Sequence, residues 1–330
     1  MHAGASQWLG VNIAPRFDQR SLALYVLLAF SGLLELIALG ISGVDVSAFF
    51  GVAEAIGLTA LILVAAMLRR LGWVRSSTGL ETCVLVAVAL AILFPLQFAM
   101  ATVPAPWADE ALFAVDRALG FDWLAFASAL RGETATRLLR IAYLSMWPQA
   151  YAILLLLAAT GAITRAWRFL TALFLIFLIA VIFIAIAPAQ GRFVLCGLHP
   201  ADIPVFLNFC DYPAVLAALH DRSLRLIDAD HMIGMVSFPS GHSAAGALFV
   251  WAVWPYRPLR LPALLLNIAL CAGAIVVGSH YLADVLAGFA LAAASLWVSR
   301  SMVPDPCVPS PLCEPAKAPA ATAQSDSMSI

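Results

Sequence analysis

The sequence predicts an all-α integral membrane protein, and two observations support this fold class. Hydrophobic residues make up 63% of the 330-residue chain and charged residues only 11%, whereas soluble domains are about half apolar and about a quarter charged. The apolar residues also gather into runs near the length of roughly 20 residues with which a helix crosses a bilayer. A net charge of −1, with no basic stripe, gives no indication of a nucleic-acid partner.

Eight apolar runs are candidate membrane spans. They cover residues 21–43, 49–68, 82–103, 140–161, 167–188, 242–256, 260–279 and 281–299. The sixth run is short and the last two nearly touch, so a six-span core preceded by two accessory N-terminal helices describes the pattern equally well. The first run is longer than the apolar segment of a signal peptide, which predicts an uncleaved anchor. Pro148 lies inside the fourth run and is expected to kink it.

Two long connections and a tail separate these runs. In residues 104–139, apolar side chains recur at near-helical spacing among acidic residues, which predicts amphipathic helix at the membrane surface. Residues 189–241 carry three arginines, including Arg192, two cysteines, three histidines and several acids. The Pro/Ala/Ser-rich composition after residue 303 predicts a disordered tail. We therefore expect accessory spans in 1–103, the functional membrane domain in 104–300 and a disordered cytoplasmic tail in 301–330.

The distribution of basic residues predicts the orientation, because short cytoplasmic loops are enriched in Lys and Arg. One side collects eleven of the 18 basic residues: Arg16, Arg20, Arg69, Arg70, Arg75, Arg165, Arg168, Arg257, Arg260, Arg300 and Lys317. The other side has seven, all in or beside the two long connections. The first side is therefore expected to be cytoplasmic. We expect the protein to lie in the cell (inner) membrane, with both termini in the cytoplasm and both long connections on the outward (periplasmic or lumenal) face.

Two of the six cysteines, Cys196 and Cys210, share the second outward connection, where oxidation is permitted. The sequence leaves open whether they form a disulfide. The same connection holds His199, His220 and His231, whose spacing from nearby aspartates matches no zinc pattern. We interpret these histidines as solvated loop residues and expect no metal.

Three short segments combine charge or imidazole with a membrane edge. In the last of them, "GSHYLADVLAG", His280 and Asp284 are four residues apart and share one helix face. A carboxylate in that position can accept the imidazole Nδ1–H and leave Nε2 free toward a substrate. The alternative is a structural pair at the interface. An acid at the start of an apolar span nevertheless indicates function, because its burial in the membrane is costly.

The segment "FPSGHSAAG" opens the sixth run. Ser240 is a favoured N-cap, and the amides of Gly241 and His242 at a helix start can bind an anion. The alternative is a capped helix start with an incidental histidine. The third segment, "APAQGRF", places Arg192 after the fifth run. The predicted topology brings all three segments to the outward face. Together they provide an arginine, an anion-binding helix start and two imidazoles, one of them paired with a carboxylate, which are groups suited to phosphoryl transfer.

"PSGH", followed roughly forty residues later by "HYLAD", resembles the type 2 phosphatidic acid phosphatase superfamily of membrane lipid phosphatases and phosphotransferases. "HYLADVLAG" and the position of Arg192 are most similar to the branch containing inositol phosphorylceramide synthase. The resemblance covers roughly residues 105–300 and implies a six-helix core. It also implies a metal-independent, cofactor-free mechanism through a phosphohistidine.

Carried over by motif, His280 would be the nucleophile and Asp284 its orienting partner. His242 would protonate the leaving alcohol and then activate the acceptor. Arg192, Ser240 and the Gly241 amide would hold the phosphoryl oxygens.

The chain departs from the phosphatase pattern at three positions. Ala185 and Ala274 stand where the pattern has a lysine and an arginine, and Phe193 stands where it has a proline. Two phosphate-binding cations are thus missing, which suggests a phosphodiester donor, a product of lower charge, or substitute cations. The substitutes available in the outward connections are Arg137, Arg140, Arg222 and Arg225, although exposed arginines are usually ordinary surface charges.

The sequence therefore predicts an outward-facing membrane enzyme that acts on a lipid or lipid-like phosphate ester. With water as acceptor it is a phosphatase, and with a lipid alcohol as acceptor it is a headgroup transferase. The alternative is a non-catalytic transporter in which His280 and Asp284 relay protons. Transporters often show two repeated halves, and the sequence shows no such repeat. The oligomeric state is left open.

Overall fold

The computed structural model describes residues 19–47, 51–130, 132–195, 212–228, 234–235 and 238–305. Within these ranges the regular structure is helical, apart from one isolated bridge between Asp45 and Leu226. The first helices are α1 (Gln19–Ser42), α2 (Val52–Arg70), α3 (Val74–Ala101), α4 (Asp109–Ala118), α5 (Trp123–Ala129), α6 (Glu133–Leu144) and α7 (Met146–Ala159). The remaining helices are α8 (Ile163–Ile184), α9 (Arg192–Leu195), α10 (Tyr212–His220), α11 (Gly241–Val253), α12 (Arg257–Val276) and α13 (Leu282–Met302).

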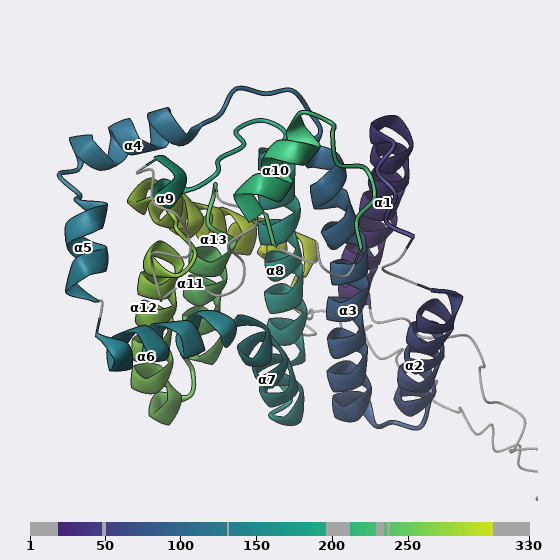
Figure 1. Ribbon diagram of the computed structural model, residues 1–330. Helices are drawn as coiled ribbons and strands as arrows, with labels where there is room; N and C mark the ends of the chain where they lie inside the picture. The colour runs from purple at the N-terminus through teal and green to yellow at the C-terminus, as the bar shows by residue number, and fades with distance from the viewer. Residues whose placement is uncertain are drawn as a thin grey trace, which may run out of the picture.

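Helix α8 forms the centre of the bundle. It packs against α3 on one side and against α11 and α13 on the other, and Figure 1 shows it between these two groups of helices. Its large side chains Trp167, Phe169 and Phe174 are almost completely buried. An apolar helix that is buried on most of its surface is typical of the core of a helical membrane bundle.

The two N-terminal helices lie at the edge of the bundle. Helix α2 contacts α3 and is exposed along most of its length, and α1 packs mainly on α3. Arg69 of α2 and Glu81 of α3 form a 2.5 Å ion pair, and the Glu81 carboxylate also accepts a hydrogen bond from Tyr25 of α1. These contacts join the accessory helices to one another at one end.

Helices lie at all eight predicted spans, but not all of them are long enough to cross a bilayer alone. Within the described residues, six helices have the length and apolar composition of a span, and the bent pair α6 and α7 adds a seventh if it is counted as one span. The run predicted at 242–256 is the 13-residue helix α11, which is about 20 Å long at 1.5 Å per residue. The sixth run was expected to be short, and it is, because the helix begins only after Pro239 and ends before the turn at Trp254.

The predicted kink in the fourth run is present. Helices α6 and α7 meet at Ser145 with an angle of 51°. Pro148 lies in the first turn of α7. In a continuous helix its ring would clash with the carbonyl four residues earlier, and it has no N–H to donate to that carbonyl. The predicted single span at 140–161 is therefore two helices.

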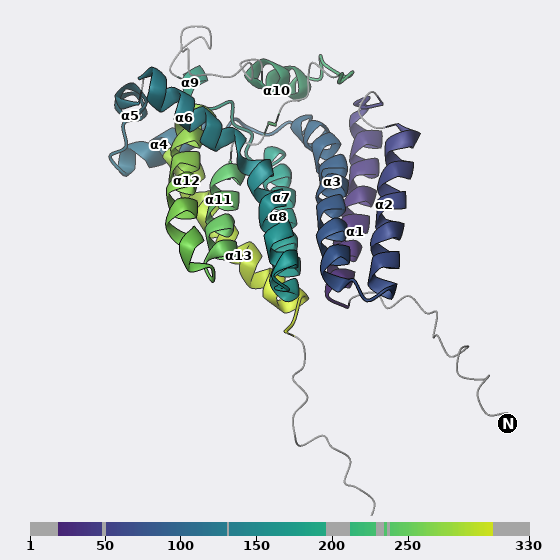
Figure 2. The same cartoon turned by 90° about the horizontal axis from the view of Figure 1, so that it is seen from below.

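The helices of the two long connections gather at one end of the bundle. Helices α4, α5, α6, α9 and α10 lie at the same end in Figure 2. This arrangement confirms amphipathic helix in residues 104–139, although the segment is divided into three pieces. Trp123 of α5 is buried, and its indole N–H donates to the carbonyl of Ile275 at the end of α12.

The arginine-rich turns meet at the opposite end. Arg75, at the start of α3, donates to the carbonyl of Ala159 at the end of α7. The neighbouring Thr160 hydroxyl lies 2.6 Å from that of Tyr256, in the turn between α11 and α12. In Figure 2 the start of α1 and the end of α13 lie at this end as well.

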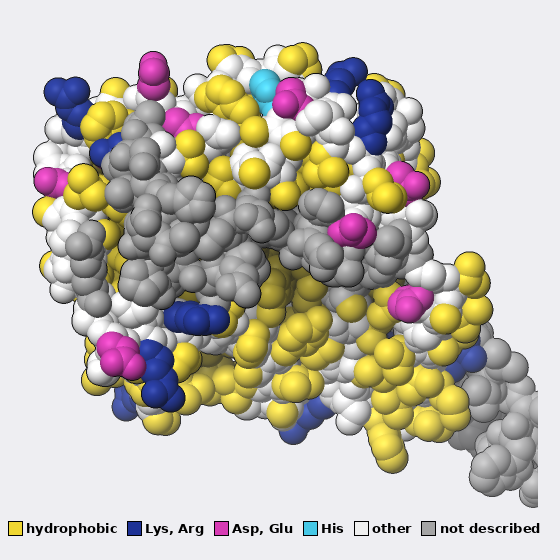
Figure 3. Space-filling view, viewed as in Figure 1, with side chains coloured by type: hydrophobic (Ala, Val, Ile, Leu, Met, Phe, Trp, Pro, Cys, Tyr) yellow, Lys and Arg dark blue, Asp and Glu magenta, His cyan; other side chains and the backbone are white. Residues whose placement is uncertain are grey.

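The surface shows the pattern expected of a bundle embedded in a bilayer. Hydrophobic side chains cover the lower centre and lower right of Figure 3, over α2, α3 and α7, while charged side chains lie along the upper edge and at the lower left. Large apolar side chains on the outer helices are strongly exposed, including Ile41, Val52 and Trp297. Cys196, Cys210, His199, His231 and the predicted tail after residue 305 lie outside the described residues.

Candidate active site

His280 and Asp284 form the centre of the candidate site. Nδ1 of His280 lies 3.1 Å from Oδ2 of Asp284, and both side chains are buried. The same carboxylate oxygen accepts the backbone N–H of Tyr281, the N-cap of α13. Because a carboxylate can only accept, the contact favours the tautomer of the neutral imidazole that carries its proton on Nδ1.

The segment at the start of α11 lies directly against this pair. The Ser240 backbone N–H donates to the carbonyl of Asp284, and the Ser240 hydroxyl oxygen accepts the N–H of Ser243 as an N-cap. The amides of Gly241 and His242 precede the first helical hydrogen bond, so they are available to an anion. The predicted N-cap at Ser240 is confirmed.

Arg192 reaches the same place from α9. Its backbone N–H donates to the carbonyl of Ser279, the residue before His280. Its guanidinium lies over the ring of Phe113 in α4, 3.8 Å from the ring centroid, and its Nε is buried with no hydrogen-bond partner among the described residues. A buried donor of this kind is costly unless a ligand completes it.

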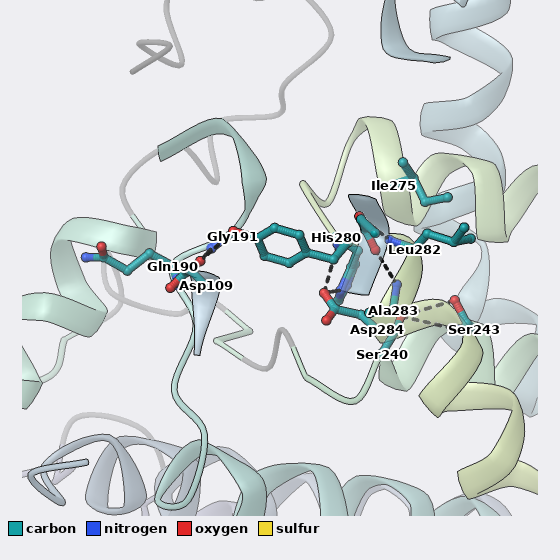
Figure 4. A network of polar contacts seen from close by, with 12 residues as sticks. Asp109, Gln190, Gly191, Ser240, Ser243, Ile275, His280, Leu282, Ala283 and Asp284 are labelled. Atoms are coloured by element: carbon teal, nitrogen blue, oxygen red, sulfur yellow. Dashed lines mark hydrogen bonds and ion pairs between the residues drawn. The ribbon is translucent and has the colours of Figure 1, made fainter. Parts of the chain in front are cut away.

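The structure thus brings together all six residues singled out from the sequence. Two backbone hydrogen bonds, from Arg192 to Ser279 and from Ser240 to Asp284, join three segments that are far apart in the chain. Figure 4 shows His280, Asp284 and Ser240 from close by, with Ser243 beside them. These contacts fix the relative positions of the groups without assigning their roles.

Two glycines allow this close approach. A Cβ on Gly288 would lie 2.6 Å from the carbonyl oxygen of Ser240, so α11 and α13 can meet only because the last residue of "HYLADVLAG" has no side chain. Gly191 has a φ of +96°, and a Cβ there would lie 3.2 Å from the carbonyl oxygen of Ser279. This positive φ favours glycine immediately before Arg192.

His242 is held by an aromatic neighbour that the sequence reasoning did not single out. Its ring stacks on Tyr143 of α6, with centroids 4.0 Å apart and planes 12° from parallel. The His242 and His280 ring centroids are 6.5 Å apart. Two imidazoles at this separation can both contact one phosphoryl group.

Two acids from α4 also reach the site. Asp109 accepts the backbone N–H groups of Gln190 and Gly191, and Asp116 accepts those of Leu282 and Ala283. The sequence reasoning noted both acids only as part of an amphipathic pattern. Their spacing of seven residues, which puts both on one helix face, was the signal available.

Burial and charge act on the titratable groups around α4. Burial, followed by the negative charge of Asp109, raises the pKa of Tyr281 well above its usual range, so the phenol stays neutral and donates to Asp109. Burial also raises the pKa of Asp116, against the lowering effect of the N–H groups of Ala283 and Leu282.

The positions of the two missing cations are apolar in the structure. Ala274 is fully buried, and its carbonyl accepts the backbone N–H of His280. Of the suggested substitutes, Arg225 donates to the carbonyl of Ser42 at the end of α1, away from the site, and Arg137, Arg140 and Arg222 are exposed. Arg117, an exposed residue of α4, lies 5.9 Å from the same Phe113 ring that contacts Arg192.

No group of three potential metal ligands occurs within the described part of the chain. The interpretation of His220 as a solvated loop residue is wrong, because it ends α10 and is partly buried: its Nε2 lies 2.8 Å from the carbonyl of Ala105, and its ring packs against Trp107. The described site therefore offers an anion-binding helix start, an arginine and two imidazoles. This is a set of groups suited to a phosphate ester.

A helical membrane bundle with a site of this kind is what we expect of an integral membrane phosphoesterase. A family model described as PAP2 superfamily matches residues 110–298, more than half of the chain, and the chain belongs to this superfamily. The match supports a phosphatase-type phosphoesterase activity. No curated protein and no solved structure matches the chain.

Proposed function

We propose that the protein acts on the phosphate ester of a lipid or lipid-like headgroup through a phosphohistidine on His280, without a metal or cofactor. One observation carries this proposal: Asp284 holds Nδ1 of His280, while the adjoining Ser279 carbonyl holds the backbone of Arg192. The nucleophilic nitrogen and the phosphate-binding cation are thereby fixed relative to each other.

In the first step, the Nε2 lone pair of His280 attacks phosphorus and the bond to the leaving alcohol oxygen breaks. His242, which carries a second proton only when the anionic ester is bound beside it, donates that proton to the leaving oxygen, so a neutral alcohol departs. Asp284 stabilises the positive charge that develops on the His280 ring. The product of this step is a phosphorylated His280 and a neutral His242.

In the second step, His242 removes a proton from the acceptor hydroxyl, whose oxygen attacks phosphorus and releases His280. Water as acceptor gives a phosphatase, and a lipid alcohol gives a headgroup transferase. Arg192, the Ser240 hydroxyl and the Gly241 amide hold the phosphoryl oxygens in both steps. The alanines at positions 185 and 274 favour a donor of lower charge, such as a phosphodiester, and hence transfer of the kind that the inositol phosphorylceramide synthase branch performs.

We further propose that the domain formed by residues 104–300 carries this activity, with the site on the outward face of the cell (inner) membrane and both termini in the cytoplasm. The charge distribution supports this orientation, since the site lies at the end opposite the arginine-rich turns (Figure 2). Residues 1–103 then serve as accessory spans, and 301–330 as a cytoplasmic tail.

A direct test uses purified protein in detergent with long-chain phosphatidic acid and phosphatidylinositol as donors and with lipid alcohols as acceptors. We expect chelator-resistant, vanadate-sensitive release or transfer of the phosphate-bearing group, and its loss in His280→Ala. A metal requirement would contradict the phosphohistidine route. If the wild type is inactive on a broad panel of lipid phosphates and acceptors, the transporter with a His280–Asp284 relay becomes the better explanation.

The substrate can be named by lipid analysis of a deletion strain. A missing headgroup-bearing lipid would identify a transferase product, and an accumulating lipid phosphate would identify a phosphatase substrate.

A further inference from the structure

One face of α4 contacts both the segment that carries Arg192 and the segment that carries His280. Asp109, Phe113 and Asp116 are spaced by four and three residues, so they line up along that face. Phe113 supports the guanidinium of Arg192. The two acids hold backbone groups on either side of it.

Asp109 joins two of the segments through a single carboxylate. Its Oδ1 accepts the N–H of Gly191 at 2.9 Å and the phenol of Tyr281 at 2.9 Å, and its Oδ2 accepts the N–H of Gln190 at 3.0 Å. Gly191 precedes Arg192, and Tyr281 follows His280. A side chain that is itself only 7% exposed therefore connects the neighbours of the cation and of the nucleophile, as Figure 4 shows for Asp109 and the adjoining backbone.

Asp116 caps α13 from a different helix. Its two oxygens accept the N–H groups of Leu282 and Ala283 at 3.0 and 2.8 Å, and the side chain is 1% exposed. These are the first two amides of α13, which the helix itself leaves unpaired. With Asp116 in place, the helix start that orients Asp284 toward His280 cannot unwind without losing two hydrogen bonds to a carboxylate.

We propose that Asp109 and Asp116 are positioning residues of the active site, and that α4 acts as a strap that holds Arg192 and His280 at their working separation. The strap acts through the backbone and through Tyr281, and neither acid touches the substrate. The catalytic part of this inference rests on the proposed function, whereas the connection between the segments does not.

The connection can be tested without a substrate by hydrogen–deuterium exchange of the full-length protein in detergent. Asp109→Asn replaces one accepting oxygen by a donor group, so exchange should accelerate together in peptides covering residues 190–192 and 281–284. Asp116→Asn should accelerate exchange only at the start of α13. Unchanged protection in both regions would overturn the strap.

The catalytic effect is measured on phosphatidic acid micelles, together with orthovanadate affinity from the vanadate-dependent shift in melting temperature. A misplacement near 1 Å can cost about 100-fold in rate. We therefore expect kcat per vanadate-binding site to fall about 100-fold in Asp109→Asn and Asp116→Asn, with little change in KM. Asp122→Asn is the matched control, because Asp122 caps α5 on the same surface segment, away from the site.

Tyr281→Phe keeps the hydrogen bonds that Asp109 accepts from the backbone N–H groups of Gln190 and Gly191, and it removes only the one from the Tyr281 hydroxyl. In a double-mutant cycle with Asp109→Asn, the two changes should be non-additive in kcat. A loss of activity that follows only the loss of folded protein, with normal kcat per vanadate site, would contradict the positioning role. A wild type that neither binds vanadate nor turns over lipid would instead contradict the proposed function, and the exchange result would still decide on the strap.

Discussion

The two imidazoles of the site are held by different physical interactions. Asp284 fixes the ring of His280 through a hydrogen bond to Nδ1, whereas His242 is fixed by stacking on Tyr143. A hydrogen bond determines which nitrogen carries the proton, and a stack leaves both nitrogens free. This difference suits a nucleophile that needs one tautomer and an acid–base residue that must change its protonation state.

Asp284→Asn should reduce activity far more than it reduces stability. The amide can present its NH₂ group to His280 and favour the wrong tautomer, which lowers kcat by about 10⁴-fold in a comparable Ser-His-Asp arrangement. We expect a loss of about 10³- to 10⁴-fold in kcat for phosphate release. Asp305→Asn, which changes an exposed partner of Arg168, is the control and should behave as wild type. An Asp284→Asn enzyme with near-normal kcat would rule out the orienting role.

Replacement of Tyr143 tests the stack on His242. Tyr143→Phe retains the ring and should keep near-normal activity, while Tyr143→Ala removes it. An aromatic contact contributes about 0.5–1.5 kcal/mol, so kcat/KM should fall about 3- to 10-fold in the alanine variant. Equal activity of the two variants would show that the stack does not position His242.

The sequence predicted the charged and imidazole groups of the site but not the residues that support them. His280, Asp284 and Arg192 could be found because ionisable groups at the edges of apolar runs are rare and costly. Tyr143 and Phe113 could not, because an aromatic residue in an amphipathic helix is most often ordinary packing. Their roles depend on which helices meet, and spacing along the chain does not contain that information.

At the scale of elements, the contact between α11 and α13 depends on the absence of a side chain. The backbone of Ser240 packs directly against Gly288 of α13, and the Ser240 carbonyl oxygen lies where a Cβ on residue 288 would need space. The contact places the amide end of α11 beside the His280–Asp284 pair. The sequence motif ends in glycine for this steric reason.

Gly288→Ala should therefore separate the two helices. The added methyl would lie 2.6 Å from a backbone oxygen and 3.2 Å from the N–H nitrogen of Ala244, neither of which can move alone. We expect a loss of about 1–3 kcal/mol in stability, seen as a lower melting temperature, together with loss of activity. Gly57→Ala, in a helix with nothing within 4 Å of the added carbon, is the matched control and should be neutral. A fully active Gly288→Ala would contradict the close approach.

Element boundaries were predicted less well than element positions. Apolar runs located the long helices because each must bury or expose a continuous apolar surface. The break at Ser145 divided the predicted fourth span, and α3 begins at Val74, eight residues before the predicted start at 82. Polar residues at the start of α3, such as Thr78 and Glu81, are buried against neighbouring helices. Hydropathy cannot detect such residues as part of a span.

At the scale of the whole molecule, the two ends differ in composition and in structure. One end holds the short arginine-bearing turns, and the other holds the site, α4, α5 and α10 (Figure 2). Basic residues therefore predicted which loops share an end.

Cysteine labelling can determine the orientation. In a background with the six natural cysteines replaced, Asp221→Cys, in the exposed turn after α10, should react with an impermeant thiol reagent on intact cells or spheroplasts. Ser76→Cys, exposed at the opposite end, should react only after lysis. The reverse pattern would place the site in the cytoplasm and overturn the proposed orientation.

The hydrogen bond between Asp109 and Tyr281 spans 172 positions in the chain, and this separation has a consequence for biosynthesis. A ribosome delivers α4 long before α13, so the nascent chain carries the strap well before it carries the nucleophile. The site can be completed only when the final helix has entered the membrane. If His280 is the nucleophile as proposed, a truncated or stalled chain would lack activity, and catalysis would begin only once insertion has finished.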